Sequence, residues 1–270
     1  MVDEQSHFGG LYEVGMQHHS ELSFYDADSD ALQIVSARES NAYPDSSMSR
    51  AMAIIRPEGF DGPIVVDLMR VQSEQSRQYD LPFYYLGQLL EKSFDAEYFV
   101  AQSPLGSSAG YEHILLEARG TSEGGSERFS WLRAGRFYTL TTATEVGDQL
   151  LLGRIGGSDP DLNLRRDPAF ILRRPAARNA LFATVLEPHG SYSPVTELAI
   201  DSVGQVNRVK VLRSDDEYSV IAIFDQRDRR ALFVVANRQF EADATHQIED
   251  EDVSLSWTGP YHWSGFIPFP

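Results

Sequence analysis

The stretch Val65-Val66-Asp67-Leu68-Met69-Arg70-Val71 is rich in β-branched residues, which favour strands. A second stretch, Ser219-Val220-Ile221-Ala222-Ile223-Phe224, is a short apolar run typical of a strand that is buried on both faces. Helical periodicity is scarce in the rest of the chain, where short runs of this kind recur. The sequence therefore predicts an all-β fold, a large antiparallel β-sandwich with room for two stacked sheets and extra strands.

Turn residues divide the rest of the chain into strand-like segments, as at Pro57-Glu58-Gly59 and Asp61-Gly62-Pro63. The stretch Phe83–Phe94 fits either a short helix or a strand, and the Gly- and Ser-rich stretch Ser103–Ser126 is expected to include loops. Because no repeat is present, we expect residues 1–270 to form one extended sandwich. The predicted strands are Gly10–Met16, Ala31–Ala37, Ser49–Ile55, Ile64–Val71, His113–Arg119, Phe129–Thr144, Gln149–Ile155, Ala169–Arg173, Ala180–Leu186, Val206–Leu212, Tyr218–Phe224, Ala231–Ala236 and Val253–Trp257.

The amino-acid composition limits the kinds of molecule that the chain can bind. The net charge of −17 argues against binding to nucleic acid or to an anionic membrane surface, and no segment is long and apolar enough for a membrane helix. An acidic ligand must therefore meet a local cluster of arginines, and every basic residue except Lys92 and Lys210 is an arginine. The amino terminus has no apolar signal segment, so the chain as written is expected to be cytoplasmic; a periplasmic location stays open if the natural start lies upstream.

Histidines are the first candidates for chemistry. His18 and His19 are adjacent, so on a strand they would point to opposite faces and could not share a metal without a bulge. His189 lies in a turn after a strong strand, where binding residues often occur, although the capping of backbone groups is the favoured alternative. No HxH or HExxH pair and no cysteine is present, so neither a metal nor another cofactor is predicted.

Arginines and a tyrosine are further candidates. Arg165-Arg166 and Arg173-Arg174 flank an apolar strand and could grip the carboxylates of an acidic sugar, but pairing with the chain's own surplus of Asp and Glu is the favoured alternative. Tyr79 precedes Asp80. A tyrosine can act as base and acid in an elimination if its pKa is lowered, while a core aromatic beside a turn-capping aspartate is the favoured alternative. No GxSxG motif or glycine-rich phosphate loop is present.

The chain contains a series of segments that match one family in order: DEQSHFGG (3–10), VSARESNAYP (35–44), VVDLMRV (65–71), QYDLPFYY (78–85) with GQ (87–88), NLRRDPAF (163–170) and LEPHGSYSP (186–194). Together they resemble the oligoalginate lyase family, polysaccharide lyases with a heparinase II/III-like domain. The resemblance covers roughly residues 3 to 200, and the tail to Pro270 is weakly marked.

The resemblance implies a two-part enzyme, a helical α/α toroid followed by β-sheet domains, that cuts short alginate chains by β-elimination. In such enzymes a tyrosine takes the proton at C5, and Asn and His neutralise the sugar carboxylate. The resemblance places these groups, the metal ligands and a second catalytic tyrosine upstream of Asp3, so no catalytic residue can be assigned here. We therefore expect residues 1–270 to be the carboxyl-terminal β-sandwich without the toroid.

Two functions remain open from the sequence. The chain is either the β-sheet part of an alginate lyase, inactive without its toroid, or a stand-alone carbohydrate-binding or structural module derived from that family. The candidate substrate-binding residues are Tyr79, Arg165, Arg166 and His189. The expected partners are a toroid domain or subunit and an acidic oligosaccharide. Self-association is also expected, because a sandwich separated from its toroid would expose apolar residues such as Phe8, Leu11 and Tyr12.

Overall fold

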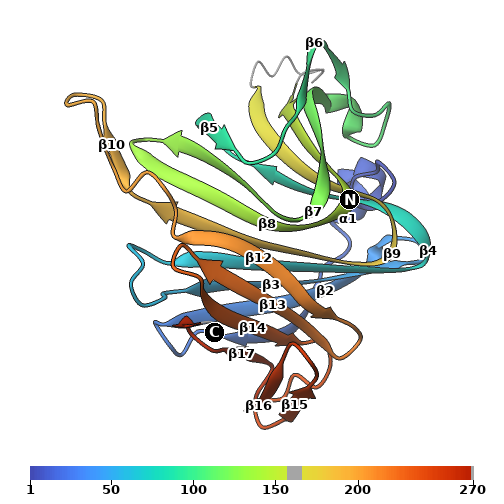
Figure 1. Cartoon of the computed structure of the whole chain (residues 1–270). Coiled ribbons are helices and arrows are strands. Elements are labelled where there is room, and N and C mark those ends of the chain that lie inside the picture. Colours follow the sequence, from blue (N-terminus) through green and yellow to red (C-terminus); the bar gives the residue numbers. More distant parts are fainter. Residues whose placement is uncertain (157–165, 269–270) are drawn as a thin grey trace.

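A computed structural model describes residues 1–156 and 166–268 of the chain (Figure 1). The prediction of an all-β, antiparallel fold is confirmed, since every strand pair within these residues is antiparallel. The helical elements are single turns, namely η1 (His7–Gly10), α1 (Tyr12–Gly15) and η2 (Tyr111–His113). No helix in the described ranges has the length and apolar character that a membrane span requires.

The larger part of the molecule is one sheet that contains nine of the described strands. Its strands follow the order β1-β2-β3-β4-β9-β8-β7-β5, and β6 pairs with β7. In that order they are β1 (Glu21–Asp26), β2 (Leu32–Tyr43), β3 (Ser46–Ile55), β4 (Ile64–Tyr84), β9 (Asp167–His189), β8 (Arg136–Ile155), β7 (Ile114–Arg133), β5 (Gln88–Lys92) and β6 (Glu97–Pro104).

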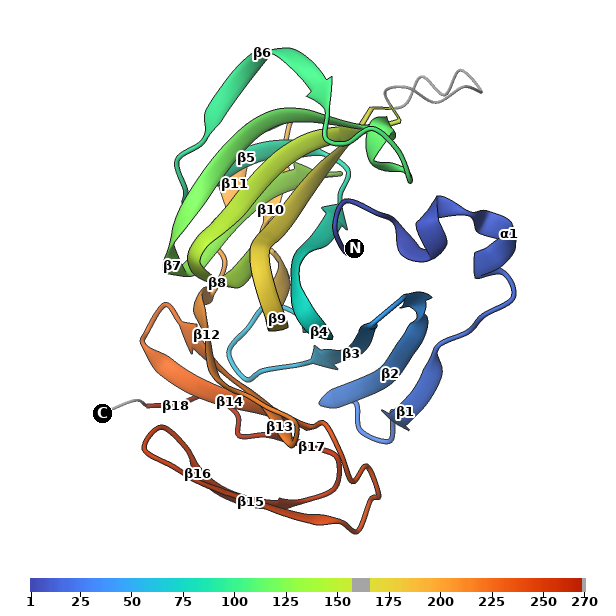
Figure 2. The same ribbon diagram turned by 90° about the vertical axis from the view of Figure 1, so that its right-hand side faces the viewer.

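A second sheet covers one face of the lower half of the large sheet (Figures 1 and 2). It contains β12 (Val206–Ser214), β13 (Tyr218–Asp225), β14 (Arg229–Ala236), β17 (Tyr261–Trp263) and β18 (Ile267–Pro268). Two hairpins complete the described strands: β10 (Ser191–Ser193) with β11 (Leu198–Ile200), and β15 (Thr245–Glu249) with β16 (Ser254–Thr258).

The long central strands bend, so the large sheet curls over itself (Figure 2). The β4–β9 register shifts between Gln72 and Tyr79, and the β8–β9 register shifts between Thr142 and Gln149. Irregularities of this kind kink a strand and increase its twist. Strand β9, at 23 residues, therefore belongs to the sandwich at one end and to the curled upper half at the other.

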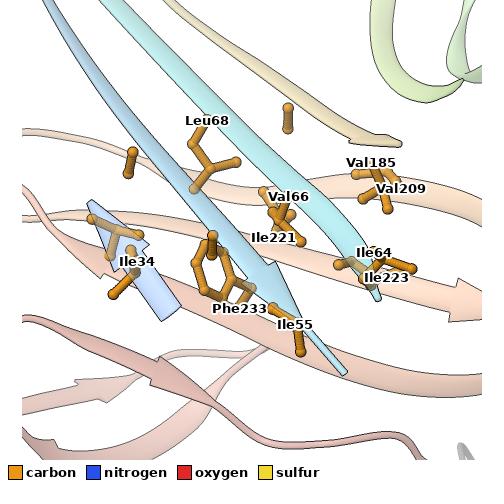
Figure 3. Packing of buried hydrophobic residues seen from close by; sticks show 14 of the residues in the cluster. Ile34, Ile55, Ile64, Val66, Leu68, Val185, Val209, Ile221, Ile223 and Phe233 are labelled. Carbon is orange, nitrogen blue, oxygen red and sulfur yellow. The ribbon is translucent and has the colours of Figure 1, made fainter. Parts of the chain in front are cut away.

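Two main cores result. The first lies between β1–β4 and β9 of the large sheet and β12–β14 of the second sheet, and includes the two stretches that predicted the fold. Figure 3 shows Val66 of β4 and Ile221 of β13 packed in this core, with Phe233 beside them. The second core fills the inside of the curl and is rich in aromatic residues, among them Phe129 and Phe170, whose ring centroids lie 4.5 Å apart.

Two strand predictions are wrong and one ambiguity is resolved. Gly10–Met16 is not a strand but turns of helix, because no neighbouring strand pairs with it and Phe8 and Gly9 before it have left-handed backbone. Phe129–Thr144 is not one strand but a hairpin, since Ala134 and Gly135 form its turn with positive φ. The ambiguous Phe83–Phe94 is extended and contains the end of β4 and all of β5.

Candidate functional site

The outer face of β1–β3, which points away from the second sheet, exposes a row of apolar side chains. Tyr25, Val35 and Met52 are cross-strand neighbours, and Ile54 lies two residues after Met52 on the same face. Together with Leu22 these side chains are between 39 and 66 % exposed. Large apolar residues that gather on one sheet face make that face a candidate interaction surface.

An ion pair lies in the same outer face. Arg50 of β3 donates from Nε and Nη2 to the two carboxylate oxygens of Asp67 on β4, at 2.8 and 2.6 Å. Asp67 is buried, whereas the Arg50 side chain is 43 % exposed. Because Asp67 fixes the guanidinium fork from below, Arg50 is held in one orientation and still presents part of its surface to solvent.

A hollow of about 420 Å³ lies beside Arg50, where the large sheet begins to curl. Its wall includes His7, Arg50, Tyr79, Tyr84 and Phe182. The ring of His7 packs edge-on against Tyr43 at 5.5 Å, and the desolvation that accompanies this packing lowers the pKa of His7. The hollow therefore combines aromatic walls with one oriented cation and one imidazole that tends to stay neutral.

The amino-terminal segment closes one side of the hollow. Val2 bridges to Tyr79, and the Asp3 backbone N–H donates to the Gln78 carbonyl at 3.0 Å. Deeper in, Arg173 forms a two-point pair with Asp80, at 2.8 Å for each bond, and donates to Glu4 at 2.8 Å. Buried charge pairs hold their geometry strongly because an unpaired member would be costly.

Beyond this anchor the amino-terminal segment exposes a second apolar group. Leu11, Tyr12, Val14 and Met16 are all exposed around α1. Figure 2 shows α1 on the same side of the molecule as β1–β3, next to the opening of the curl. We call this opening the mouth; it comprises the hollow, the apolar row on β1–β3 and the apolar residues around α1.

Tyr79, the tyrosine singled out in the sequence, lies in the wall of the hollow but is buried. Its hydroxyl lies 2.5 Å from Ser73 Oγ and 3.3 Å from the Arg178 carbonyl oxygen. Burial raises the pKa of Tyr79. A tyrosine that acts as a base requires a shift in the opposite direction, so the interior environment does not prepare Tyr79 for that role.

His189 lies far from Tyr79 along the same sheet. It is the last residue of β9 and pairs with Phe137, whereas Tyr79 pairs with Arg174 near the first third of that strand. The His189 ring is buried, with Nε2 2.9 Å from Thr139 Oγ1 and Nδ1 2.8 Å from the Asp201 carbonyl oxygen. Both ring nitrogens have protein partners, as expected for a structural histidine.

The arginine candidates separate into two groups. Arg165 lies outside the described residues, and Arg166 is exposed, with Nη1 3.4 Å from Gln102 Oε1. Arg173 and Arg174 are buried and pair with the chain's own acids, Arg174 with Asp148 at 3.0 and 2.8 Å. The favoured alternative of internal pairing is thus confirmed for these two. Neither Arg166 nor His189 is brought to the mouth.

Residues that matter in the mouth were missed in the sequence. Arg50 carries no motif, and only its place among the outward-facing residues of β3, two before Met52, distinguishes it. His7 occurs in the DEQSHFGG segment but was not singled out as a functional residue. Within the described residues, no group of three or more His, Asp or Glu side chains is arranged to hold a metal ion.

Comparisons with known proteins identify relatives of the whole chain. It is 34 % identical over 264 residues to an alginate lyase of Stenotrophomonas maltophilia, and 31 % identical over 264 residues to an exo-oligoalginate lyase of Saccharophagus degradans. These matches cover 97 and 96 % of this chain but 35 % of each relative, at the carboxyl-terminal end. The chain therefore spans about a third of the length of the curated relatives it matches.

Two other comparisons add less. No family model matches the chain. A solved heparinase III structure overlaps 81 % of this chain and 28 % of its own, with a TM-score of 0.45 and 10 % sequence identity. An overlap at that level says nothing about activity.

Proposed function

The chain belongs to the alginate lyase family as a relative of its carboxyl-terminal region, and from this premise we propose that it is the β-sheet part of an alginate lyase. In this proposal it takes part in the cleavage of uronate polysaccharide by β-elimination only together with a helical toroid domain, whether that domain lies on the same polypeptide or on another. The chain by itself does not depolymerise alginate.

The mouth is the observation that carries this proposal. Exposed apolar side chains lie on both of its sides, on β1–β3 and around α1, in a protein whose net charge is −17. Apolar side chains that gather on one side of a strongly acidic protein are unfavourable in water unless something covers them, so this arrangement supports a protein partner. A toroid domain seated on the mouth would cover both apolar groups and enclose the hollow between them.

The chemistry of β-elimination explains why the partner is needed. The reaction requires a base for the C5 proton, a group that neutralises the sugar carboxylate, and an acid for the leaving oxygen. In the mouth, Arg50 offers a positive charge that Asp67 has already oriented. The raised pKa of Tyr79 makes it unsuited as the base. We therefore assign Arg50 and His7 to the wall that faces the saccharide, with Tyr79 as structural support behind them, and the base to the toroid.

The proposal is tested by complementation. The amino-terminal two thirds of the Stenotrophomonas maltophilia relative is coexpressed with this chain, and each half is also prepared alone. The absorbance of unsaturated uronate is then followed on oligo-mannuronate and oligo-guluronate. We expect turnover from the combined halves only. The Arg50→Gln variant should lower this turnover by at least about tenfold if Arg50 touches the substrate or orients the interface.

Two results would contradict the proposal. Turnover by this chain alone, lost in Tyr79→Phe, would place a complete site in the β-sheet part. A lack of turnover by the combined halves, despite a stable complex between them, would support a binding module in place of a lyase component. The variant Arg119→Gln, on an exposed part of β7, serves as a matched control that removes an arginine away from the mouth.

A further inference from the structure

A second opening lies on the other face of the same strands, at the end of the sandwich where the two sheets separate. The inward-facing residues of each strand change from apolar to polar at this end. In β2 the series is Ile34, Ser36, Arg38; in β3 it is Ala51, Ser49, Ser47; in β4 it is Leu68, Arg70, Gln72. The sandwich core therefore continues into a polar cleft between the sheets.

Strand register places the polar residues side by side. Arg38 pairs with Ser49, and Ser49 pairs with Arg70, so a small serine lies between two arginines across three strands. The next polar row pairs Ser47 with Gln72. Directly opposite residues in a sheet have Cβ atoms roughly 5 Å apart, so the small Ser49 leaves a gap in the wall of the cleft between the bases of the two arginine side chains.

The opposite wall consists of Ser219 on β13 of the second sheet, together with Asp216, Asn237 and Arg238 in the segments next to β13 and β14. Asp216 accepts hydrogen bonds from Arg70 at 2.7 Å and from the Gln72 amide at 2.9 Å, and Arg238 approaches it at 3.3 Å. A single carboxylate thus shares its oxygens among two arginines and an amide.

The cleft has more positive groups than its own acid can match. Its lining includes Arg38, Arg70 and Arg238 but only the one acid, Asp216. The Arg38 side chain has no hydrogen bond or ion pair within the described ranges, although Glu21 of β1 is its cross-strand neighbour and the chain carries 40 acidic residues. Since most of the surface is acidic, this local excess of arginine calls for a specific explanation.

Hydroxyl groups are also available. Ser23, Ser36, Ser47 and Ser49 all line the cleft, and within the described part of the chain none of their hydroxyls has a protein partner. None of these four hydroxyl oxygens is fully buried without a partner, so solvent or a ligand can reach each one. Free serine hydroxyls beside an unpaired guanidinium are suited to a ligand that has both alcohols and a carboxylate.

We propose that this cleft binds a single hexuronate unit, with Arg38 as the residue that receives its carboxylate. The guanidinium fork matches a carboxylate at two points, and the serines face the sugar hydroxyls. The cleft holds about 140 Å³, well below the roughly 300–1,000 Å³ of sites for drug-sized ligands, so one sugar ring is the appropriate size. The choice of a uronate over other hydroxy-carboxylates rests on the proposed function.

The binding site is separate from the mouth. Inward-facing Arg38 and Arg70 lie on the face that packs toward the second sheet, whereas Arg50 lies on the outer face. A uronate in the cleft would therefore occupy a secondary site, available whether or not a toroid covers the mouth.

The test measures binding by the full chain without any partner. Titration calorimetry or ligand-observed NMR is carried out with D-mannuronate, with neutral D-mannose and with acetate. We expect mannuronate to bind at least about tenfold more tightly than either of the other two, because only mannuronate engages both the arginine and the hydroxyls. Arg38→Gln should weaken mannuronate binding at least about tenfold, and Arg38→Lys should recover part of the loss.

Controls keep the test decisive. Arg119→Gln removes an exposed arginine of β7 whose side chain has no partner in the part of the chain that the structure describes, and it should leave binding unchanged. Melting curves of all variants confirm that each is folded. Equal binding of mannose or acetate, or full mannuronate binding by Arg38→Gln, would overturn the proposal. Because no turnover is measured, a failure of the complementation experiment and a failure of this one are distinguishable.

Discussion

The two faces of β2, β3 and β4 have opposite characters. On the outer face, Val35, Met52 and Ile54 leave apolar surface exposed, and Arg50 is matched by Asp67. On the inner face at the open end of the sandwich, serines and arginines replace the core residues, and the Arg38 side chain has no partner among the described residues. Residues that alternate along the same strands therefore form two surfaces suited to different partners.

The physical basis of this difference is the range and direction of the interactions. Apolar burial is non-directional and grows with area, so an open apolar face gains most from a large protein partner. Charge-assisted hydrogen bonds are directional and strongest where water is partly excluded, so a narrow cleft with guanidinium groups gains most from a small anion. The mouth is open toward solvent, whereas the cleft is graded: Arg70 inside it is only 12 % exposed, and Arg38 at its rim is exposed.

The sharpest test of this comparison uses neighbouring residues of β3. Ile55 points into the sandwich core and is fully buried, whereas Ile54 points outward and is 44 % exposed. We expect Ile55→Ala to lower the free energy of unfolding by about 2–5 kcal/mol, because it leaves a cavity. Ile54→Ala should cost less than about 1 kcal/mol. Urea unfolding of both variants measures the difference.

Protein concentration serves as the control for that experiment. If Ile54→Ala is as costly as Ile55→Ala at high concentration but not at low concentration, the outer face is covered by a second copy of the chain. If the two are equally costly at all concentrations, the outer face is packed within the monomer, and the apolar row is not a docking surface.

A matched pair of tyrosines tests the mouth itself. Tyr25 on the outer face is 66 % exposed, and Tyr98 on β6, at the far end of the curl, is 61 % exposed. Exposed aromatics at an interface often contribute 1–2 kcal/mol or more, so Tyr25→Ala should weaken association with the amino-terminal part of a lyase relative by about tenfold. Tyr98→Ala should not. Surface plasmon resonance provides the measurement, and equal losses would show that the mouth has no special role.

Local pattern was enough to predict the sandwich and its central strands. The apolar runs at 65–71 and 219–224 became β4 and β13 because β-branched residues at these positions are buried between the sheets. Pattern failed where pairing decides structure. The Ala134-Gly135 turn lacks the usual Asn-Gly or Asp-Gly signal, so a hairpin was mistaken for one strand. Short edge strands such as β17 have too few residues to show alternation.

The candidate sites were harder to predict than the fold. His189 and Tyr79 stood out as chemically versatile side chains, but both are held in the interior by hydrogen bonds. His189 bonds to Thr139, which is distant in sequence, and Tyr79 bonds to Ser73, which belongs to no motif. The cleft depends on Arg38 and Arg70 lying on either side of Ser49, which follows from the register of three strands. Sequence alternation shows that these residues are inward-facing but not which residues lie opposite them.

A smaller effect is expected within the cleft. Asp216 competes with an incoming carboxylate for Arg70 and Arg238. Replacing it by asparagine keeps the shape and removes the charge, so Asp216→Asn should tighten mannuronate binding by roughly two- to fivefold, the size typical of an exposed charge pair. Calorimetric titration compares it with the unaltered chain. Weaker binding in this variant would mean that Asp216 orients the arginines for the ligand, and the competition argument would be wrong.

The smallest expected effect is that of pH on mannuronate affinity, and it distinguishes binding in the cleft from binding in the mouth. Hydrogen bonds from Gln72 and Arg70 lower the pKa of Asp216, and an ordinary aspartate is already ionised at pH 5. The arginines stay protonated over the same pH range. No other titratable group lines the described part of the cleft.

A uronate also remains ionised at pH 5, because an ordinary carboxyl has a pKa of about 4 or below. Mannuronate affinity should therefore change less than about twofold between pH 7 and pH 5, and should fall only when the pH drops below about 4 and the ligand itself is neutralised. A midpoint near pH 6 would point to a histidine, either His19, which lies two residues before the cross-strand neighbour of Arg38, or His7 in the mouth. Loss of that midpoint in His7→Gln but not in His19→Gln would place the sugar on the outer face of the strands, and the division between the two surfaces would not hold.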